Sequence, residues 1–175
     1  MDQRQNNQRA ISQFANPLEA LDKSFAVFVA VAENYPHESV REKPSAIGFS
    51  ATEIVYHMLD VERLWQQRIR RLLERTLTYF EAMNPDREAV QNRYNEKQFD
   101  PGILDLAAAR LDTHRLIRSL TKEQFELTGI HSKYGPMNIV RILEIMEEHD
   151  RTHAAQLDRT LAAIRSKSLS IHKTL

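Results

Sequence analysis

Residues 139–164 read IVRILEIMEEHDRTHAAQLDRTLAAI, and this stretch decides the fold. Apolar residues recur in it every three or four positions, which is the pattern of one face of an α-helix. We therefore predict a helix from Met137 to Arg165. Two histidines, His149 and His153, occupy consecutive positions of the apolar face. A helix with one apolar face buries it against other elements, so the rest of the chain is expected to supply further helices.

The first half of the chain contains signals for two such helices. Asn16 and Pro17 suit the N-cap and the first position of a helix that ends at residues 34–36. Ser50-Ala-Thr-Glu53 has the form of a capping box, in which the Ser and Glu side chains each bind a free backbone N–H. The helix that it opens is expected to reach about Tyr79.

A third helix is predicted from Asp100, as N-cap, to about Thr121. It is flanked by two long connections, residues 81–99 and 122–136, of which the second contains the breaker Tyr134-Gly135-Pro136. Because these connections are long, helices that follow one another in sequence need not be antiparallel neighbours. The inner face of the third helix is expected to consist of Leu104, Ala107, Leu111, His114 and Ile117.

Together these elements predict an all-α four-helix bundle with long inter-helix connections over residues 16–165. Residues 1–15 are interpreted as a flexible N-terminal segment and residues 166–175 as a C-terminal tail. The composition agrees, because only 4 Gly and 6 Pro occur in 175 residues. A sheet protein needs more turns than this allows.

Charge and composition exclude several partners. With 24 basic and 24 acidic residues the net charge is zero, so no overall field attracts nucleic acid or an anionic membrane. No apolar run approaches the roughly 18 residues that span a bilayer, and residues 1–15 lack the apolar core of a secretion signal. We therefore predict a cytoplasmic protein. The basic cluster Arg68–Arg71 with Arg75 is interpreted as a solvated helix face.

Three histidines form the strongest functional signal. His149 and His153 are four residues apart, so their rings lie one above the other on one helix face. His57 interrupts the apolar face of the second helix in the same way. Each alone is best interpreted as a core histidine with ordinary hydrogen bonds, but three such residues on facing helices favour a shared metal ion. The absence of cysteine leaves only nitrogen and oxygen ligands.

The candidates for acid–base roles are weaker. Glu53 lies one turn before His57 and Asp60 nearly one turn after it, so both are candidate catalytic residues. The alternatives are helix capping for Glu53 and, for Asp60, a surface acid or an acid that orients an imidazole. His114 is interpreted as a core residue. His131 and Tyr134 are interpreted first as ordinary loop residues, and a place at the rim of the site is the alternative.

Two motifs carry a resemblance to a known family. Glu53-Ile-Val-Tyr-His57-Met-Leu-Asp-Val-Glu62 is the first, and Gly135-Pro-Met-Asn with the later Glu148-His149-Asp150-Arg-Thr-His153-Ala-Ala-Gln156-Leu is the second. The chain resembles the DinB-like (DinB/YfiT) metal-binding four-helix bundles, which include thiol transferases that use bacillithiol or mycothiol. The family's metal ligands, one His from the second helix and two from the fourth, correspond to His57, His149 and His153.

The resemblance implies a divalent metal, zinc or nickel, and a small-molecule substrate. A low-molecular-weight thiol as cosubstrate and a homodimer are further implications. Three His ligands leave one position open, as in catalytic sites. The leading hypothesis is a metal-dependent enzyme that activates a thiol, and the close alternative is a metal-dependent hydrolase. A non-enzymatic bundle that binds a metal or a small molecule, and a metal-free structural bundle, complete the alternatives.

Overall fold

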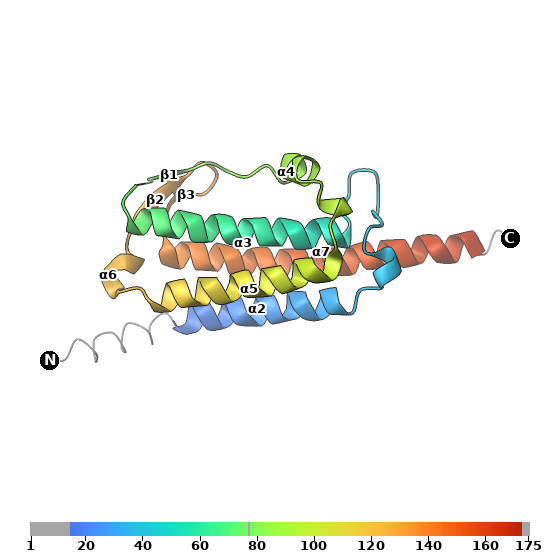
Figure 1. Cartoon of the computed structure of the whole chain (residues 1–175), viewed down its shortest axis with the longest axis horizontal. Coiled ribbons are helices and arrows are strands. Elements are labelled where there is room, and N and C mark those ends of the chain that lie inside the picture. Colours follow the sequence, from blue (N-terminus) through green and yellow to red (C-terminus); the bar gives the residue numbers. More distant parts are fainter. Residues whose placement is uncertain (1–14, 77, 173–175) are drawn as a thin grey trace.

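The computed structural model describes residues 15–76 and 78–172 and consists mainly of four long helices that lie side by side (Figure 1). Helix α2 packs along α7, and α3 packs along both α5 and α7. The predicted all-α four-helix bundle is therefore confirmed. Within the described residues no helix has the length and apolar character needed to span a membrane. The four helices are α2 (Ala15–Glu33), α3 (Ala51–Leu73), α5 (Phe99–Arg118) and α7 (Ile139–His172).

The long connection after α3 decides the order of the helices. It runs back over the bundle to the end at which α3 began, so α3 and α5 point in the same direction (Figure 1). On the way it forms the short helices α4 (Pro85–Gln91) and η2 (Tyr94–Glu96). A shorter link after α2 contains the helical turn η1 (His37–Ser39).

A small sheet at one end of the bundle was not predicted. It has the order β1 (Tyr79–Phe80), β2 (Thr128–His131) and β3 (Gly135–Asn138), and the short helix α6 (Lys122–Phe125) precedes β2. Strands β1 and β2 are parallel, whereas β2 and β3 form an antiparallel hairpin in which His131 faces Gly135. Because β3 leads directly into α7, the sheet fixes His131 beside the start of that helix.

Two predicted helix ends are wrong. Helix α3 ends at Leu73 because Arg75 adopts a left-handed conformation, φ 57°, and the N–H of Thr76 turns back to the carbonyl of Arg71. This is a Schellman C-cap with arginine where glycine is usual, and the sequence gives little sign of it. Helix α7 continues through His172, since no Gly or Pro follows Arg165 to stop it. The proposed tail is therefore helical over residues 166–172, and residues 173–175 lie outside the described residues.

Two predicted N-caps lie inside their helices. Asn16 is the second residue of α2 as described, and Asp100 is in the first turn of α5, whose N-cap is Gln98. The capping box of α3 is confirmed: Ser50 Oγ accepts from the Glu53 N–H at 3.1 Å, and Glu53 Oε2 accepts from the Ser50 N–H at 2.9 Å. The expected flexible segment, residues 1–15, lies outside the described residues except for Ala15, which is helical.

The buried face of α5 also differs from the prediction. Leu104 and Leu111 are 70% and 58% exposed, whereas Ile103, Leu106 and Arg110 are buried. Apolar periodicity misplaced this face because part of its buried surface is polar, namely Arg110 and its neighbour Thr113. Those two side chains belong to a hydrogen-bonded network that joins all four helices.

Arg110 is the centre of this network. Its guanidinium donates to both carboxylate oxygens of Glu62 in α3, at 2.8 and 3.1 Å, and to both of Asp150 in α7, at 2.9 and 3.1 Å. It also donates to the Leu21 carbonyl of α2, and Ser24 of α2 donates to Asp150. With all three charged groups buried, each hydrogen bond replaces solvation that the group has lost. The network therefore fixes how the helices sit against one another.

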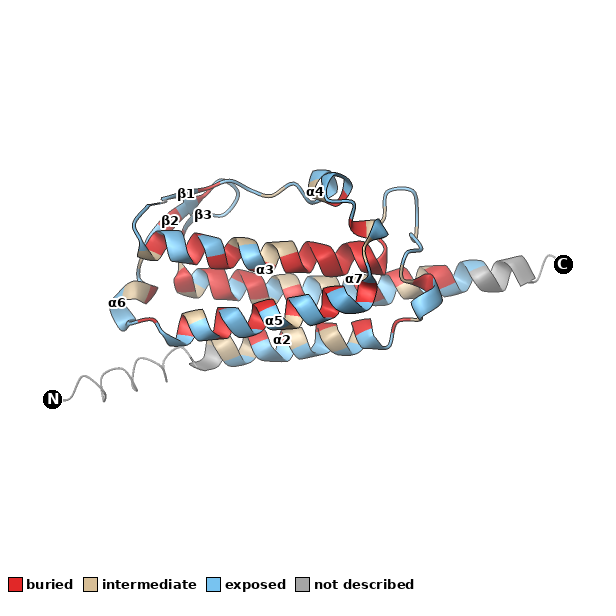
Figure 2. Ribbon diagram, viewed as in Figure 1, coloured by how far each residue is buried: buried red, intermediate tan, exposed pale blue. Residues whose placement is uncertain are grey.

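The apolar core is divided into two parts by a polar layer. In α3, residues 54–59 pack in one part and residues 65–72 in the other, with Glu62 between them. In α7, residues 139–146 and 154–164 divide in the same way around His149 and Asp150. Figure 2 shows buried residues along both helices, and the first half of α3 is buried on all sides. The three candidate histidines lie in the middle of the bundle, next to the Arg110 network.

Candidate metal centre

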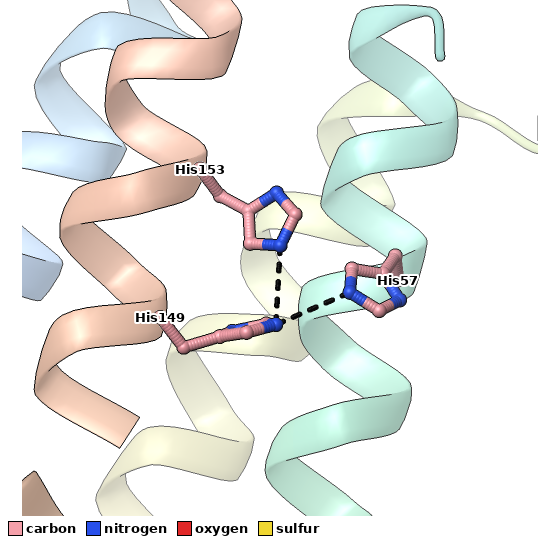
Figure 3. A group of neighbouring side chains, drawn as sticks. All are labelled: His57, His149 and His153. Atoms are coloured by element: carbon pink, nitrogen blue, oxygen red, sulfur yellow. Dashed lines mark hydrogen bonds between the residues drawn. The ribbon is translucent and has the colours of Figure 1, made fainter. Parts of the chain in front are cut away.

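Three imidazoles from two helices meet at one point, as predicted. Nε2 of His149 lies 3.2 Å from Nε2 of His57 and 3.1 Å from Nε2 of His153 (Figure 3). One ligand atom of each residue lies within 4.8 Å of those of the other two. Four nitrogen ligands at 2.0–2.1 Å around a tetrahedral ion are about 3.3 Å apart, and the distances from His149 to His57 and to His153 are close to this value.

Ordinary hydrogen bonds do not explain this cluster. A ring nitrogen carries either one proton or one lone pair, so Nε2 of His149 cannot satisfy both neighbouring nitrogens at once. In addition, Nδ1 of His57 is buried and has no hydrogen-bond partner among the described residues. A cation between the rings would use the lone pair of each Nε2. The donor set therefore fits a divalent metal bound by nitrogen.

Burial keeps the rings neutral, as metal binding requires. It lowers the pKa of His57 to about 3 and that of His149 to about 2, and the other imidazoles of the cluster add to the effect. Burial also lowers the pKa of His153. Near neutral pH all three nitrogens are thus free of the extra proton that would compete with a metal.

One hydrogen bond orients the third ring. Nδ1 of His153 lies 2.7 Å from Oε1 of Gln156, one turn later in α7. An amide oxygen only accepts, so the proton of His153 is on Nδ1 and its Nε2 lone pair points at the cluster. Outer hydrogen bonds of this kind are usual for metal-binding histidines. Gln156 belongs to the quoted motif, but no role was predicted for it.

A cavity of about 430 Å³ opens on one side of the three imidazoles. Its walls come from α3, α7, the β2–β3 hairpin and the loops around Gly48 and Met83. This volume suits a small molecule. Apart from the three histidines, its lining includes Phe49, Val61, Leu64, Trp65, Arg68, Met83, Asp86, His131, Lys133, Tyr134, Ile145 and Gln156.

The two predicted catalytic carboxylates are not brought into this cavity. Glu53 caps α3, and its other oxygen accepts from Lys43 Nζ at 2.7 Å. Asp60 is half-buried, and its Oδ2 accepts from the Tyr94 hydroxyl at 2.5 Å and from Asn92 at 3.2 Å. Neither residue lines the cavity. Catalytic roles for Glu53 and Asp60 stay predictions.

The remaining predicted residues divide between core and cavity. His114 is buried, as expected for a core residue, with Nε2 2.6 Å from Oδ1 of Asp22. His131 and Tyr134 line the cavity, but His131 lies at the end of strand β2 and not in a loop, whereas Tyr134 lies in the turn between β2 and β3. The interpretation of the basic cluster is wrong for Arg68, which is buried against Trp65 and Phe80. Arg70 and Arg71 are exposed, as predicted.

The comparisons agree with this fold. A family model described as the DinB superfamily matches residues 20–157, and the chain therefore belongs to the DinB superfamily. Among solved structures, the chain is similar to YfiT from Bacillus subtilis, described as a probable metal-dependent hydrolase with an unusual four-helix bundle topology. The TM-score is 0.73 at 15% identity, and the match covers 85% of this chain and 86% of that one. At this identity the likeness establishes the fold alone. No protein with a curated function matches the chain.

Proposed function

We propose that this chain is a metal-dependent enzyme in which His57, His149 and His153 hold one divalent metal, zinc or nickel. The observation that carries the proposal is that three neutral imidazoles converge at the edge of a cavity of about 430 Å³. When bound there, the metal supplies Lewis-acid activation of a thiol or a water molecule. The protein supplies the neutral ligands, the orientation of His153 by Gln156, and the walls of the cavity.

Transfer of a low-molecular-weight thiol is the reaction that we favour. Asp86, at the start of α4, is the only carboxylate among the described residues that line the cavity, and it is exposed. A thiol loses its proton far more readily than water does, whereas activation of water commonly uses a nearby general base. The scarcity of carboxylates thus favours a thiol as the nucleophile. The cavity lining combines apolar and aromatic side chains with polar and charged ones, and it is suited to a small organic cosubstrate that carries polar groups.

Hydrolysis is the second candidate. It is supported by the fold likeness to YfiT, a probable metal-dependent hydrolase. His131 lies in the cavity wall, and burial together with the Arg68 charge lowers its pKa, so its ring is neutral. Its Nδ1 accepts from the Lys133 N–H, so the neutral ring offers Nε2–H as a hydrogen-bond donor to a substrate that is hydrolysed in the cavity. A homodimer remains a prediction in either case.

One set of assays separates these functions. Protein loaded with zinc or nickel is mixed with monochlorobimane and a panel of thiols including bacillithiol, and separately with chromogenic esters. We expect thiol conjugation above the uncatalysed rate, lost in His153→Ala and retained in His37→Ala, whose histidine is exposed. Ester hydrolysis with the same dependence, but no conjugation, would favour the hydrolase. Metal binding without either activity would favour a non-enzymatic binding protein.

A further inference from the structure

The cavity contains a second polar feature at a distance from the histidines, the guanidinium of Arg68. Arg68 follows His57 by eleven residues in α3, which is close to three helical turns. Both side chains therefore lie on the same face of the helix, with α-carbons about 16 Å apart along the axis. Each lines the same cavity. The cavity thus extends along α3 from the imidazoles to Arg68.

Arg68 is buried, and none of the described residues provides it with a counter-ion. Its side chain is only 6% exposed, and its guanidinium carbon lies 4.5 Å from the centre of the Trp65 ring and 5.5 Å from that of Phe80. One N–H group donates to the backbone carbonyl of Glu81. No ion pair among the described residues includes Arg68, and burial lowers its pKa to about 10.

An unpaired buried charge is costly, so its presence calls for an explanation. Arg110 is the comparison within the same bundle: it is a buried arginine with a structural role, and it is paired with both Glu62 and Asp150. Arg68 differs in two respects: it has no such partner within residues 15–76 and 78–172, and it lines a cavity that is large enough for a ligand. An arginine whose role is to bind an anionic ligand is expected to line a cavity and to have no ion-pair partner before the ligand binds.

The wall beside Arg68 is a cluster of aromatic rings. The centre of the His131 ring lies 5.8 Å from that of Trp65 and 4.8 Å from that of Tyr134, and both pairs of rings are tilted. Nδ1 of His131 accepts from the backbone N–H of Lys133 at 3.0 Å, so in the neutral ring the proton is on Nε2. Nζ of Lys133 lies 5.3 Å from the centre of the Tyr134 ring. This wall therefore adds a hydrogen-bond donor and a second cation at the Arg68 end of the cavity.

We propose that Arg68 binds a carboxylate at one end of the substrate, while the reacting end lies at His57, His149 and His153. This inference rests on the proposed function for the position of the reacting end. Arginine binds carboxylates through two parallel N–H groups, and its stacking on Trp65 holds the guanidinium plane in place. The side chains between the two ends, Val61 and Leu64, are apolar. The substrate class is thus an elongated molecule with an apolar middle and an anionic end.

Trp65 makes the proposal directly measurable, because it is the only tryptophan in the chain and touches Arg68. Metal-free protein is titrated with hexanoate and with the matched neutral hexan-1-ol, and Trp65 fluorescence is followed. Zinc-loaded protein is titrated with ω-mercaptohexanoate and ω-mercaptooctanoate and with their alcohols. We expect each acid to bind at least about tenfold more tightly than its alcohol, as charge-assisted hydrogen bonds imply.

Variants then assign the preference to one residue. Arg68→Gln is expected to remove the preference for acids, and Arg68→Lys to keep part of it. Arg70→Gln, an exposed neighbour in the same helix, is the control and should bind as the wild type does. Equal binding of acid and alcohol by the wild-type protein, or a preference that survives in Arg68→Gln, would overturn the proposal. The metal-free titration decides this even if the protein binds no zinc, so failure of the metal proposal is recognised separately.

Discussion

Nε2 of His57 and Nε2 of His149 lie 3.2 Å apart, although 92 residues separate them in sequence. One belongs to α3 and the other to α7, so the distance depends on how these two helices pack. The residue after His149 is Asp150, and Asp150 is joined to Glu62 of α3 through Arg110. The buried charge network therefore fixes the helix packing on which the candidate metal centre depends.

Removal of Arg110 is expected to be strongly destabilising. In Arg110→Met the carboxylates of Glu62 and Asp150 remain buried without their cation, and loss of one partner of a buried ion pair costs about 3–5 kcal/mol. Urea unfolding measures this change. Adding Glu62→Gln and Asp150→Asn to the same chain should restore part of the loss, because neutral side chains are less costly to bury.

Arg115→Met is the matched control for that prediction. Arg115 lies in the same helix and pairs with Asp112, but its side chain is 76% exposed. Exposed ion pairs contribute roughly 0–1 kcal/mol. If Arg110→Met proved no more destabilising than Arg115→Met, the network would not have the structural role described above.

Gln156 is expected to set the metal affinity through His153. In Gln156→Leu the Nδ1 proton of His153 loses its acceptor, and loss of such outer hydrogen bonds typically weakens metal binding about 10–100-fold. Gln156→Glu keeps an acceptor and should bind at least as tightly as the wild type. Competition with a chromophoric chelator measures both. Equal affinity of Gln156→Leu and wild type would show that this hydrogen bond does not matter for the site.

The metal-free protein is expected to lose stability in acid because of the buried imidazoles. In the unfolded chain a histidine binds a proton below about pH 6.5, whereas in the folded chain the pKa of His57 is about 3 and that of His149 about 2. Between these values the unfolded state binds more protons, so the free energy of unfolding falls as the pH falls below 6.5. From pH 6.5 to 5 each ring should contribute a loss of roughly 2 kcal/mol.

Urea unfolding of chelator-treated protein at several pH values tests this loss. The double variant His57→Gln/His149→Gln lacks both rings and should show a smaller decrease in stability between pH 6.5 and 5. The comparison removes the contributions of all other titrating groups, which the two proteins share. Parallel curves for the two proteins would contradict the burial of neutral imidazoles.

Much of the fold and the candidate metal centre could be predicted from the sequence for one physical reason. His57, His149 and His153 interrupt long apolar stripes, and such stripes show which face of a helix is buried. The sheet was missed because its strands have two to four residues, too short for a periodic pattern. The reason for a glycine at position 129 is likewise visible only in the packed structure, because an added Cβ would lie 2.7 Å from the Phe80 ring.

The burial of charged residues was the other feature that the sequence did not predict. Patterning assigns charged residues to the surface, so Arg68 was placed on a solvated face and no role was predicted for Arg110. The partners that allow Arg110 to be buried come from three other helices, and no local stretch of sequence contains them. For the same reason the hydrogen bonds of Asp60 to Tyr94 and Asn92 were not predicted, whereas the capping role of Glu53 was among the alternatives read from the sequence.

Metal content measured by native mass spectrometry with elemental analysis tests the central proposal most directly. Wild-type protein and the variants His57→Ala and His37→Ala are supplied with zinc and nickel and then freed of excess metal. We predict one metal ion per chain in the wild type and in His37→Ala, whose histidine is remote and exposed. We predict none in His57→Ala. A wild-type chain that retains no metal, or a His57→Ala variant that retains a full equivalent, would contradict the proposed metal centre.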